Sequence, residues 1–86
     1  MKRINKKRRE PVLQNVLDVV TRCYEAKCGI HNSVLMKHIT ILLGPCSVTD
    51  EVNHCLSEGV SVVDQRFIEK IVASLQHRAE ALDVVA

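Results

Sequence analysis

The spacing of its aliphatic residues limits the fold of this sequence more than any other feature. In residues 64–82, apolar side chains recur every three or four positions, at Phe67, Ile68, Ile71, Val72, Leu75, Ala79 and Leu82. Residues 11–28 repeat the pattern, with Leu13, Val16, Leu17, Val20 and Tyr24. This periodicity is typical of amphipathic helices, so the sequence predicts an all-α fold. The many valines leave a strand over residues 16–21 as a minor alternative.

Helix caps and turn residues divide the first half of the chain into two helices. Pro11 suits the first turn of a helix, and Gly29 is expected to end that helix in a left-handed conformation. Asn32 or Ser33 can cap a short second helix, which Gly44 terminates together with the proline that follows it.

The second half carries similar signals. Ser47 and Asp50 resemble a capping box that opens a third helix, and Gly59 ends it. Asp64 or Ser61 can cap the fourth and longest helix. We therefore expect a small bundle of about four helices, arranged as two helical hairpins.

A faint internal repeat relates residues 23–43 to residues 55–75. Each segment begins with a cysteine and contains an early glycine before an apolar helix, in which Leu35, Met36, Ile39 and Leu43 match Phe67, Ile68, Ile71 and Leu75. Gly29 and Gly59 are two places out of step in this alignment. Two stacked hairpins that resemble each other by chance are therefore favoured over a duplication.

The size of the chain favours self-association. Its 86 residues make one domain, expected over residues 11–86, and Tyr24 and Phe67 are its two aromatic residues. An aliphatic excess on so small a body favours a homodimer or a larger oligomer. The residues expected at the oligomer or partner interface are Leu35, Met36, Ile39, Leu42, Phe67, Ile68, Ile71, Leu75 and Leu82.

Charge is distributed unevenly along the chain. Residues 1–10, the basic arm, contain Lys2, Arg3, Lys6, Lys7, Arg8 and Arg9, whereas the sequence from residue 10 onward has six Lys or Arg against ten Asp or Glu. Like charges at this density predict a flexible arm, which is expected either to bind a partner or only to solubilise the chain. An acidic helical body suits protein partners better than nucleic acid.

The cysteines and histidines raise the possibility of a metal site. Cys23, Cys28 and His31 have the spacing C-x4-C-x2-H, so a structural zinc module is one alternative. On a continuous helix, however, Cys28 lies about 140° around from Cys23, so the two thiols would not converge. We expect reduced thiols in a cytoplasmic protein of a bacterial or phage-infected cell, without a cofactor and without a membrane segment.

No enzyme is expected, because the chain has no Gly-rich phosphate loop, nucleophile elbow or paired-carboxylate motif. Direct DNA binding is the main alternative, with the basic arm contacting phosphates or a minor groove. A helix-turn-helix that reads the major groove is disfavoured. The second helix has Val34, Leu35 and Ile41 where a recognition helix needs polar side chains.

In overall build the chain resembles the small phage-encoded antirepressors. The resemblance rests on the size of the chain, the basic start at residues 1–9 and the aliphatic helices expected over residues 11–28, 33–43 and 64–82. It implies an all-helical, oligomeric, non-enzymatic regulator that binds a transcriptional repressor and prevents its DNA binding.

Overall fold

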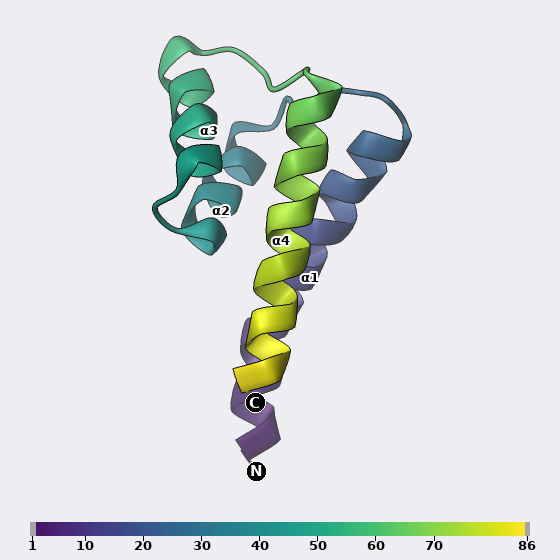
Figure 1. Cartoon of the computed structure of the whole chain (residues 1–86), viewed down its shortest axis with the longest axis vertical. Helices are drawn as coiled ribbons and strands as arrows, with labels where there is room; N and C mark the ends of the chain where they lie inside the picture. The colour runs from purple at the N-terminus through teal and green to yellow at the C-terminus, as the bar shows by residue number, and fades with distance from the viewer. Residues whose placement is uncertain (1, 86) are drawn as a thin grey trace.

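The chain folds into four α-helices. The computed structural model describes the backbone of residues 2–85 and the side chains of residues 11–81. The helices are α1 (Lys2–Glu25), α2 (Ser33–Leu43), α3 (Ser47–Glu58) and α4 (Gln65–Val85) (Figure 1). The predicted all-α fold is confirmed, and residues 16–21 lie within α1 rather than in a strand.

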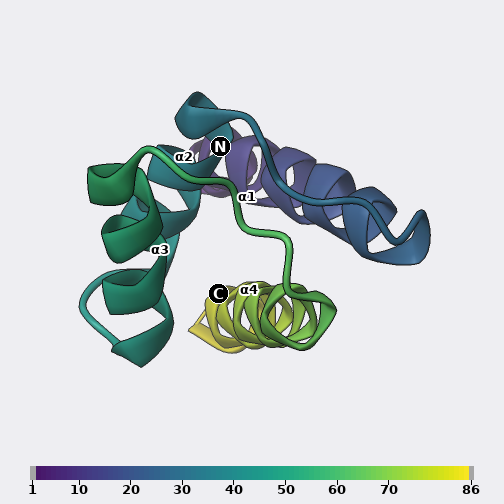
Figure 2. The same ribbon diagram turned by 90° about the horizontal axis from the view of Figure 1, so that it is seen from above.

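The two long helices form the spine of the molecule. α1 and α4 run antiparallel, with both chain ends at the same tip, and α2 and α3 lie together on one side of this pair (Figures 1 and 2). α1 packs mainly on α4, and α2 packs on both α3 and α4. The first half of the chain contains α1 and α2, and the second half contains α3 and α4. Each helix therefore packs mainly against a helix of the other half, so neither half is a self-contained hairpin.

Helix α1 includes the backbone of the basic arm. It begins at Lys2 and passes through Pro11, so residues 2–10 belong to the same helix as the residues that follow them. The flexibility that the like charges of the arm predict stays a prediction. Pro11 then lies in the helix interior, where it lacks the N–H group that would bond to the carbonyl four residues earlier.

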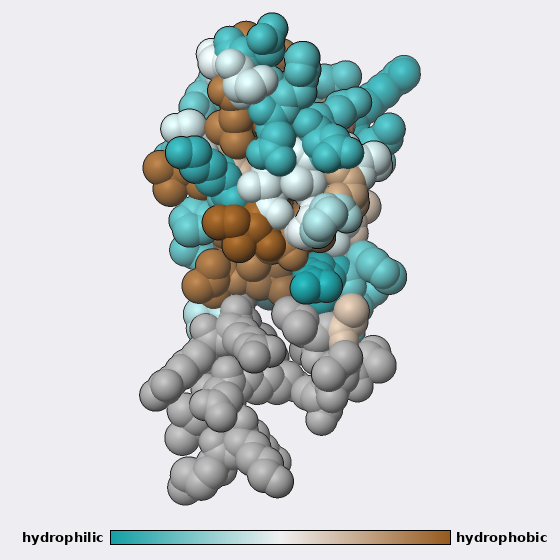
Figure 3. Space-filling view, turned by 90° about the vertical axis from the view of Figure 1, so that its left-hand side faces the viewer, coloured by the Kyte–Doolittle hydropathy of each residue, from teal (hydrophilic) through white to brown (hydrophobic). Residues whose placement is uncertain are grey.

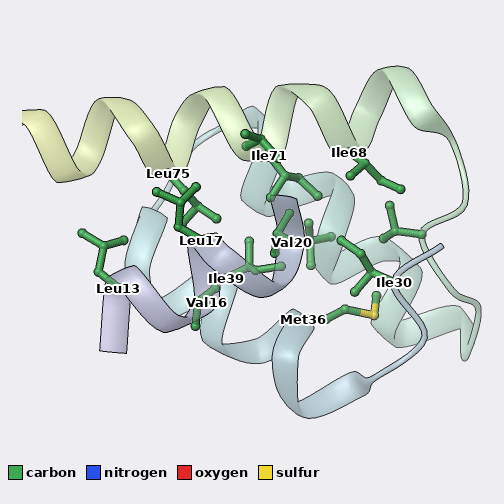
Figure 4. Close-up of a cluster of buried hydrophobic side chains, with 13 residues drawn as sticks. Leu13, Val16, Leu17, Val20, Ile30, Met36, Ile39, Ile68, Ile71 and Leu75 are labelled. Carbon is green, nitrogen blue, oxygen red and sulfur yellow. The ribbon is translucent and has the colours of Figure 1, made fainter. Parts of the chain in front are cut away.

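An aliphatic core fills the space between the helices (Figure 4). Its buried members are Leu13, Val16, Leu17, Val20, Ile30, Met36, Ile39, Val52, Val62, Ile68, Ile71, Val72 and Leu75. Five of them had been expected at an oligomer or partner interface, namely Met36, Ile39, Ile68, Ile71 and Leu75. That expectation is corrected, because these side chains are buried by packing within one chain and are not accessible to a partner.

Several predicted helix ends are confirmed. The Asn32 side chain caps α2 by accepting hydrogen bonds from two backbone N–H groups, and the Asp64 side chain does the same for α4. Gly44 ends α2, and Gly59 ends α3 in a left-handed conformation with φ of 69°. The capping box predicted at Ser47 is wrong: Cys46 occupies the N-cap, and Ser47 is already the first helical residue.

The end of α1 also differs from the prediction. Lys27, with φ of 56°, takes the left-handed position that had been assigned to Gly29. The Cys28 N–H group bonds to the Cys23 carbonyl at 3.0 Å, and the Lys27 N–H group bonds to the Tyr24 carbonyl at 3.1 Å. This pair of bonds is the Schellman motif, which satisfies the last carbonyls of a helix.

The two halves of the chain share one structural plan. Lys27 and Gly59, 32 residues apart, hold equivalent left-handed positions, and the bond from Cys28 to Cys23 recurs from Val60 to Cys55. The caps Asn32 and Asp64 are also 32 residues apart. The sequence alignment had placed Gly29 and Gly59 two positions out of step. In the structure Lys27, not Gly29, corresponds to Gly59, so the two turns match at each of these positions.

A β-bridge joins the two equivalent turns. The Ile30 N–H group donates to the Val62 carbonyl at 2.7 Å, and the Val62 N–H group donates to the Ile30 carbonyl at 3.1 Å. These two residues also correspond in the 32-residue repeat. The bridge therefore pairs each half with the other at matching positions.

Candidate functional site

An apolar groove between α1 and α2 is the most promising site among the described residues. It has a volume of about 460 Å³, is open to solvent, and is lined by Asn15, Val16, Val19, Cys23, Ile30, His31, Asn32, Val34, Leu35 and His38. Helix α1 supplies one wall and α2 the other. Its apolar lining comes from valine, isoleucine, leucine and cysteine side chains, which a partner's apolar surface could remove from water.

The floor and the walls of the groove differ in exposure. Val16 and Ile30 are buried and belong to the core, so they fix the floor of the groove. Val34 is 60% exposed and Val19 and Leu35 are half-buried, so they form its accessible surface. An exposed valine beside a fixed apolar floor leaves surface that a partner can remove from water.

Polar side chains border the groove, and its lining residues include no Asp, Glu, Lys or Arg. His31 Nδ1 and Ser61 Oγ lie 2.9 Å apart and hydrogen-bond, which fixes the His31 ring against the α3–α4 turn. Asn32 is committed to the α2 cap. His38, one turn beyond Val34, is exposed on the second wall.

The interface residues and the arm residues expected from the sequence divide into four groups. Leu35 lines the groove, while Leu42 and Phe67 are half-buried and pack against the core. The five core residues named above are inaccessible. The side chain of Leu82 and those of Lys2, Arg3, Lys6, Lys7, Arg8 and Arg9 lie outside the described residues.

Sequence reasoning missed Val19, Val34 and His38 as accessible lining residues. One signal in the sequence could have identified them. Helix α2 is apolar on nearly every side, but only one side of a helix can face the core, so some of its apolar side chains had to be accessible. Val34 lies near the α2 N-terminus, on the side that faces away from the buried Met36 and Ile39.

Exposed apolar side chains also occur outside the groove. Ile41, in the last turn of α2, is 75% exposed, and Val60 and Val63 are exposed in the α3–α4 turn. Figure 3 shows apolar surface gathered on the face formed by α2 and α3. Ile41 is not among the residues that line the groove.

The thiols have distinct surroundings. Cys28 is exposed, and its Sγ lies 3.6 Å from the Cys23 carbonyl. Burial, together with interaction with the Cys28 thiol, raises the pKa of Cys23. The hydroxyl of Thr49, with backbone N–H groups of Thr49 and Val48, lowers the pKa of Cys46 at the start of α3.

The expected non-convergence of Cys23 and Cys28 is wrong. The prediction assumed a continuous helix, whereas α1 ends at Glu25 and the Schellman turn folds Cys28 back over Cys23. Even so, the described residues contain no group of three or more His, Cys, Asp or Glu side chains arranged to hold a metal ion. Within the same part of the chain, no helix has the length and apolar character needed to cross a membrane.

Exposed charges of both signs occur on the described residues, with Arg66, Lys70 and Arg78 on α4 and acidic side chains concentrated on α3. Helix α3 carries Asp50, Glu51 and Glu58, all exposed, and has no lysine or arginine. Exposed side chains on α2 include one lysine, Lys37.

No protein-family model, curated protein or solved structure matches the chain.

Proposed function

We propose that the protein is a non-enzymatic regulator that binds a protein partner in the groove between α1 and α2. The observation that carries the proposal is the accessible apolar wall of Val19, Val34 and Leu35 over a floor already fixed by the core. An amphipathic helix laid into such a groove would bury its own apolar face against that wall.

A helix suits the groove better than a small molecule does. Sites for small ligands bury most of the ligand surface. This groove is open along one side and shallow enough to leave Val34 mostly exposed. The polar border of Asn15, His31 and His38 fits the polar margin of a helix, which remains in contact with water.

The partner that we propose is a transcriptional repressor, following the resemblance of the chain to antirepressors. Binding would act on transcription if the groove had higher affinity for a repressor state that cannot engage DNA, because a ligand shifts an equilibrium only through such a difference. The acidic exposed face of α3 supports a protein partner over DNA, since it repels phosphate. Self-association of the chain is compatible with this proposal and is a separate prediction.

A pair of α2 variants tests the groove. Val34→Asp places a charge on the groove wall, whereas Ile41→Asp places the same charge on an equally apolar and more exposed position of the same helix, outside the groove. The protein partner recovered from the native host should bind wild type and Ile41→Asp alike and bind Val34→Asp at least tenfold more weakly. Equal binding by all three proteins would contradict the proposal.

A DNA titration tests the main alternative. Duplex DNA should bind wild type only weakly at physiological salt, with no preference for a sequence. Tight binding that falls steeply with salt, and that deletion of residues 1–9 abolishes, would instead assign the function to the basic arm. A gel shift of the captured repressor on its operator then tests the mechanism, because wild type should release the repressor and Val34→Asp should not.

A further inference from the structure

The Schellman turn at the end of α1 brings two thiols together. In this motif the C3 and C″ residues are joined by a backbone hydrogen bond and their side chains usually make an apolar contact. Here those positions are Cys23 and Cys28, whose backbones are joined at 3.0 Å. The equivalent pair in the second half is Cys55 and Val60, whose backbones are joined by the same bond at 3.0 Å.

The geometry of this turn suits a disulfide. The single backbone hydrogen bond from Cys28 to Cys23, at 3.0 Å, limits the separation of their Cα atoms to less than about 7 Å, given standard backbone bond lengths. Disulfides need Cα separations of about 4.4–6.8 Å. The Cys28 thiol is also directed back toward Cys23, because its Sγ lies 3.6 Å from the Cys23 carbonyl oxygen. Formation of the bond therefore requires rotation of side chains and little movement of backbone.

We propose that Cys23 and Cys28 form a reversible dithiol–disulfide site, with Cys28 as the thiol that reacts first and Cys23 as the thiol that resolves the product. Exposure assigns the order, since Cys28 is open to solvent and Cys23 is half-buried on the groove side of α1. Redox-sensing cysteines have this arrangement of an accessible thiol beside a resolving one. The proposal does not depend on what the groove binds.

The reaction consumes one equivalent of a peroxide. The Cys28 thiolate attacks hydrogen peroxide, the O–O bond breaks, and Cys28 sulfenic acid and hydroxide are formed. The Cys23 thiol then attacks the sulfenic sulfur, the S–O bond breaks, and water leaves as the S–S bond forms. Sulfur is oxidised by two electrons and peroxide oxygen is reduced by two. A thiol reductant reverses the step by exchange.

The raised pKa of Cys23 is consistent with this order. Burial and the neighbouring Cys28 thiol both disfavour the Cys23 thiolate, so it is the poorer first nucleophile. The bond would also tie the last turn of α1 to the loop that follows. That loop is already anchored to α4 by the hydrogen bond from Gln65 Nε2 to the Cys28 carbonyl at 3.3 Å.

The sequence offers a direct readout, because Arg22, Lys27 and Lys37 place both cysteines on separate tryptic peptides. The full-length protein is oxidised with excess hydrogen peroxide, its remaining thiols are blocked, and it is digested without reduction. The proposal predicts that the peptide Cys23–Lys27 is linked to the peptide Cys28–Lys37, and that dithiothreitol separates them. Recovery of these two peptides unlinked from folded, oxidised protein would overturn the proposal, as would preferential linkage of Cys28 to Cys46 or Cys55.

Two controls keep the result specific to the fold. Oxidation in concentrated urea should give a mixture of cysteine pairs, so an equal yield of the Cys23–Cys28 link with and without urea would remove the role assigned to the turn. The Cys23→Ala variant should accumulate Cys28 sulfenic acid, which dimedone traps, while wild type under the same conditions shows at least several-fold less adduct. Equal trapping in both proteins would show that Cys23 does not resolve it.

Discussion

At Gly29 the backbone of the α1–α2 turn lies against the backbone of the α3–α4 turn. A Cβ atom at this position would lie 2.8 Å from Val63 Cγ1, 2.9 Å from the Val62 carbonyl oxygen and 3.1 Å from His31 Nε2. Gly29 is therefore required for the close approach that lets Ile30 and Val62 pair, and not for a left-handed conformation as the sequence predicted.

The Gly29→Ala variant should lose about 1–3 kcal/mol of unfolding free energy, because the added methyl group forces the two turns apart. Urea denaturation measures the loss. Gly59→Ala is the matched control, since its Cβ would meet open space and only its positive φ would be strained. In native-state hydrogen exchange, Ile30 and Val62 amides should lose protection in Gly29→Ala and keep it in Gly59→Ala. Unchanged protection in Gly29→Ala would contradict this role.

Cys46 is the second residue with a testable local environment. Its Sγ lies 3.2 Å from Thr49 Oγ1, and that hydroxyl lowers the pKa of the thiol together with nearby N–H groups at the α3 N-terminus. Thr49 Oγ1 also donates to the Gly44 carbonyl, so its single proton is shared between two acceptors when the thiolate forms.

Because the pKa is lowered, the thiolate fraction of Cys46 at neutral pH exceeds that of an unperturbed thiol. Thr49→Val should raise this pKa, so iodoacetamide should alkylate Cys46 more slowly near pH 7, and the difference should shrink as the pH rises above the pKa of the thiol. Thr49→Ser keeps the hydroxyl and should react at nearly the wild-type rate. Mass spectrometry of the alkylated peptide follows each rate, and equal rates for Val and Ser variants would refute the assignment.

At the scale of the elements, the turns that end α1 and α3 are built alike from different residues. The sequence identified Gly59 because glycine is the usual left-handed residue, and it missed Lys27 because lysine seldom takes that conformation. The same error concealed the repeat and the thiol contact, since both depend on where α1 stops. Two of the helix caps were easier to predict, because Asn32 and Asp64 act through their own side chains, whereas the capping box predicted at Ser47 was wrong.

Because the turns after α1 and α3 have the same geometry, exchanging their left-handed residues should change the unfolding free energy in opposite directions. Lys27→Gly should raise the unfolding free energy by about 0.5–1 kcal/mol, because it relieves a left-handed side-chain clash at some cost in chain entropy. Gly59→Lys should lower it by about 1 kcal/mol for the converse reason. Thermal unfolding of the two variants measures both changes. A loss of stability in Lys27→Gly would show that the two turns are not equivalent.

At the scale of the whole molecule, the helical spacing predicted the fold class and most of the core, because periodicity reports which face of a helix is apolar. It could not tell a side chain that packs within the chain from one that packs against a partner. Met36, Ile39, Ile68, Ile71 and Leu75 belong to the first class. The groove could not be predicted either, since it depends on how α1 and α2 diverge.

Burial predicts a clear contrast between two isoleucines. Ile71→Ala should lose about 2–5 kcal/mol of unfolding free energy, because the truncated side chain leaves a cavity in the core. Ile41→Ala, at a position that is 75% exposed, should change it by less than about 0.5 kcal/mol. Urea unfolding of both variants at several protein concentrations measures this difference. If the loss in Ile71→Ala disappeared on dilution of both proteins, Ile71 would belong to an interface after all.

The central claim is that a protein partner occupies the groove between α1 and α2. Site-specific photo-cross-linking tests it most directly, with benzoylphenylalanine placed at Val34 inside the groove or at Ile41 outside it. In the presence of the partner, illumination should give one discrete cross-linked product from position 34, carrying a peptide of that partner, and little or none from position 41. Equal cross-linking from both positions, or none from position 34 while the complex persists, would contradict the account.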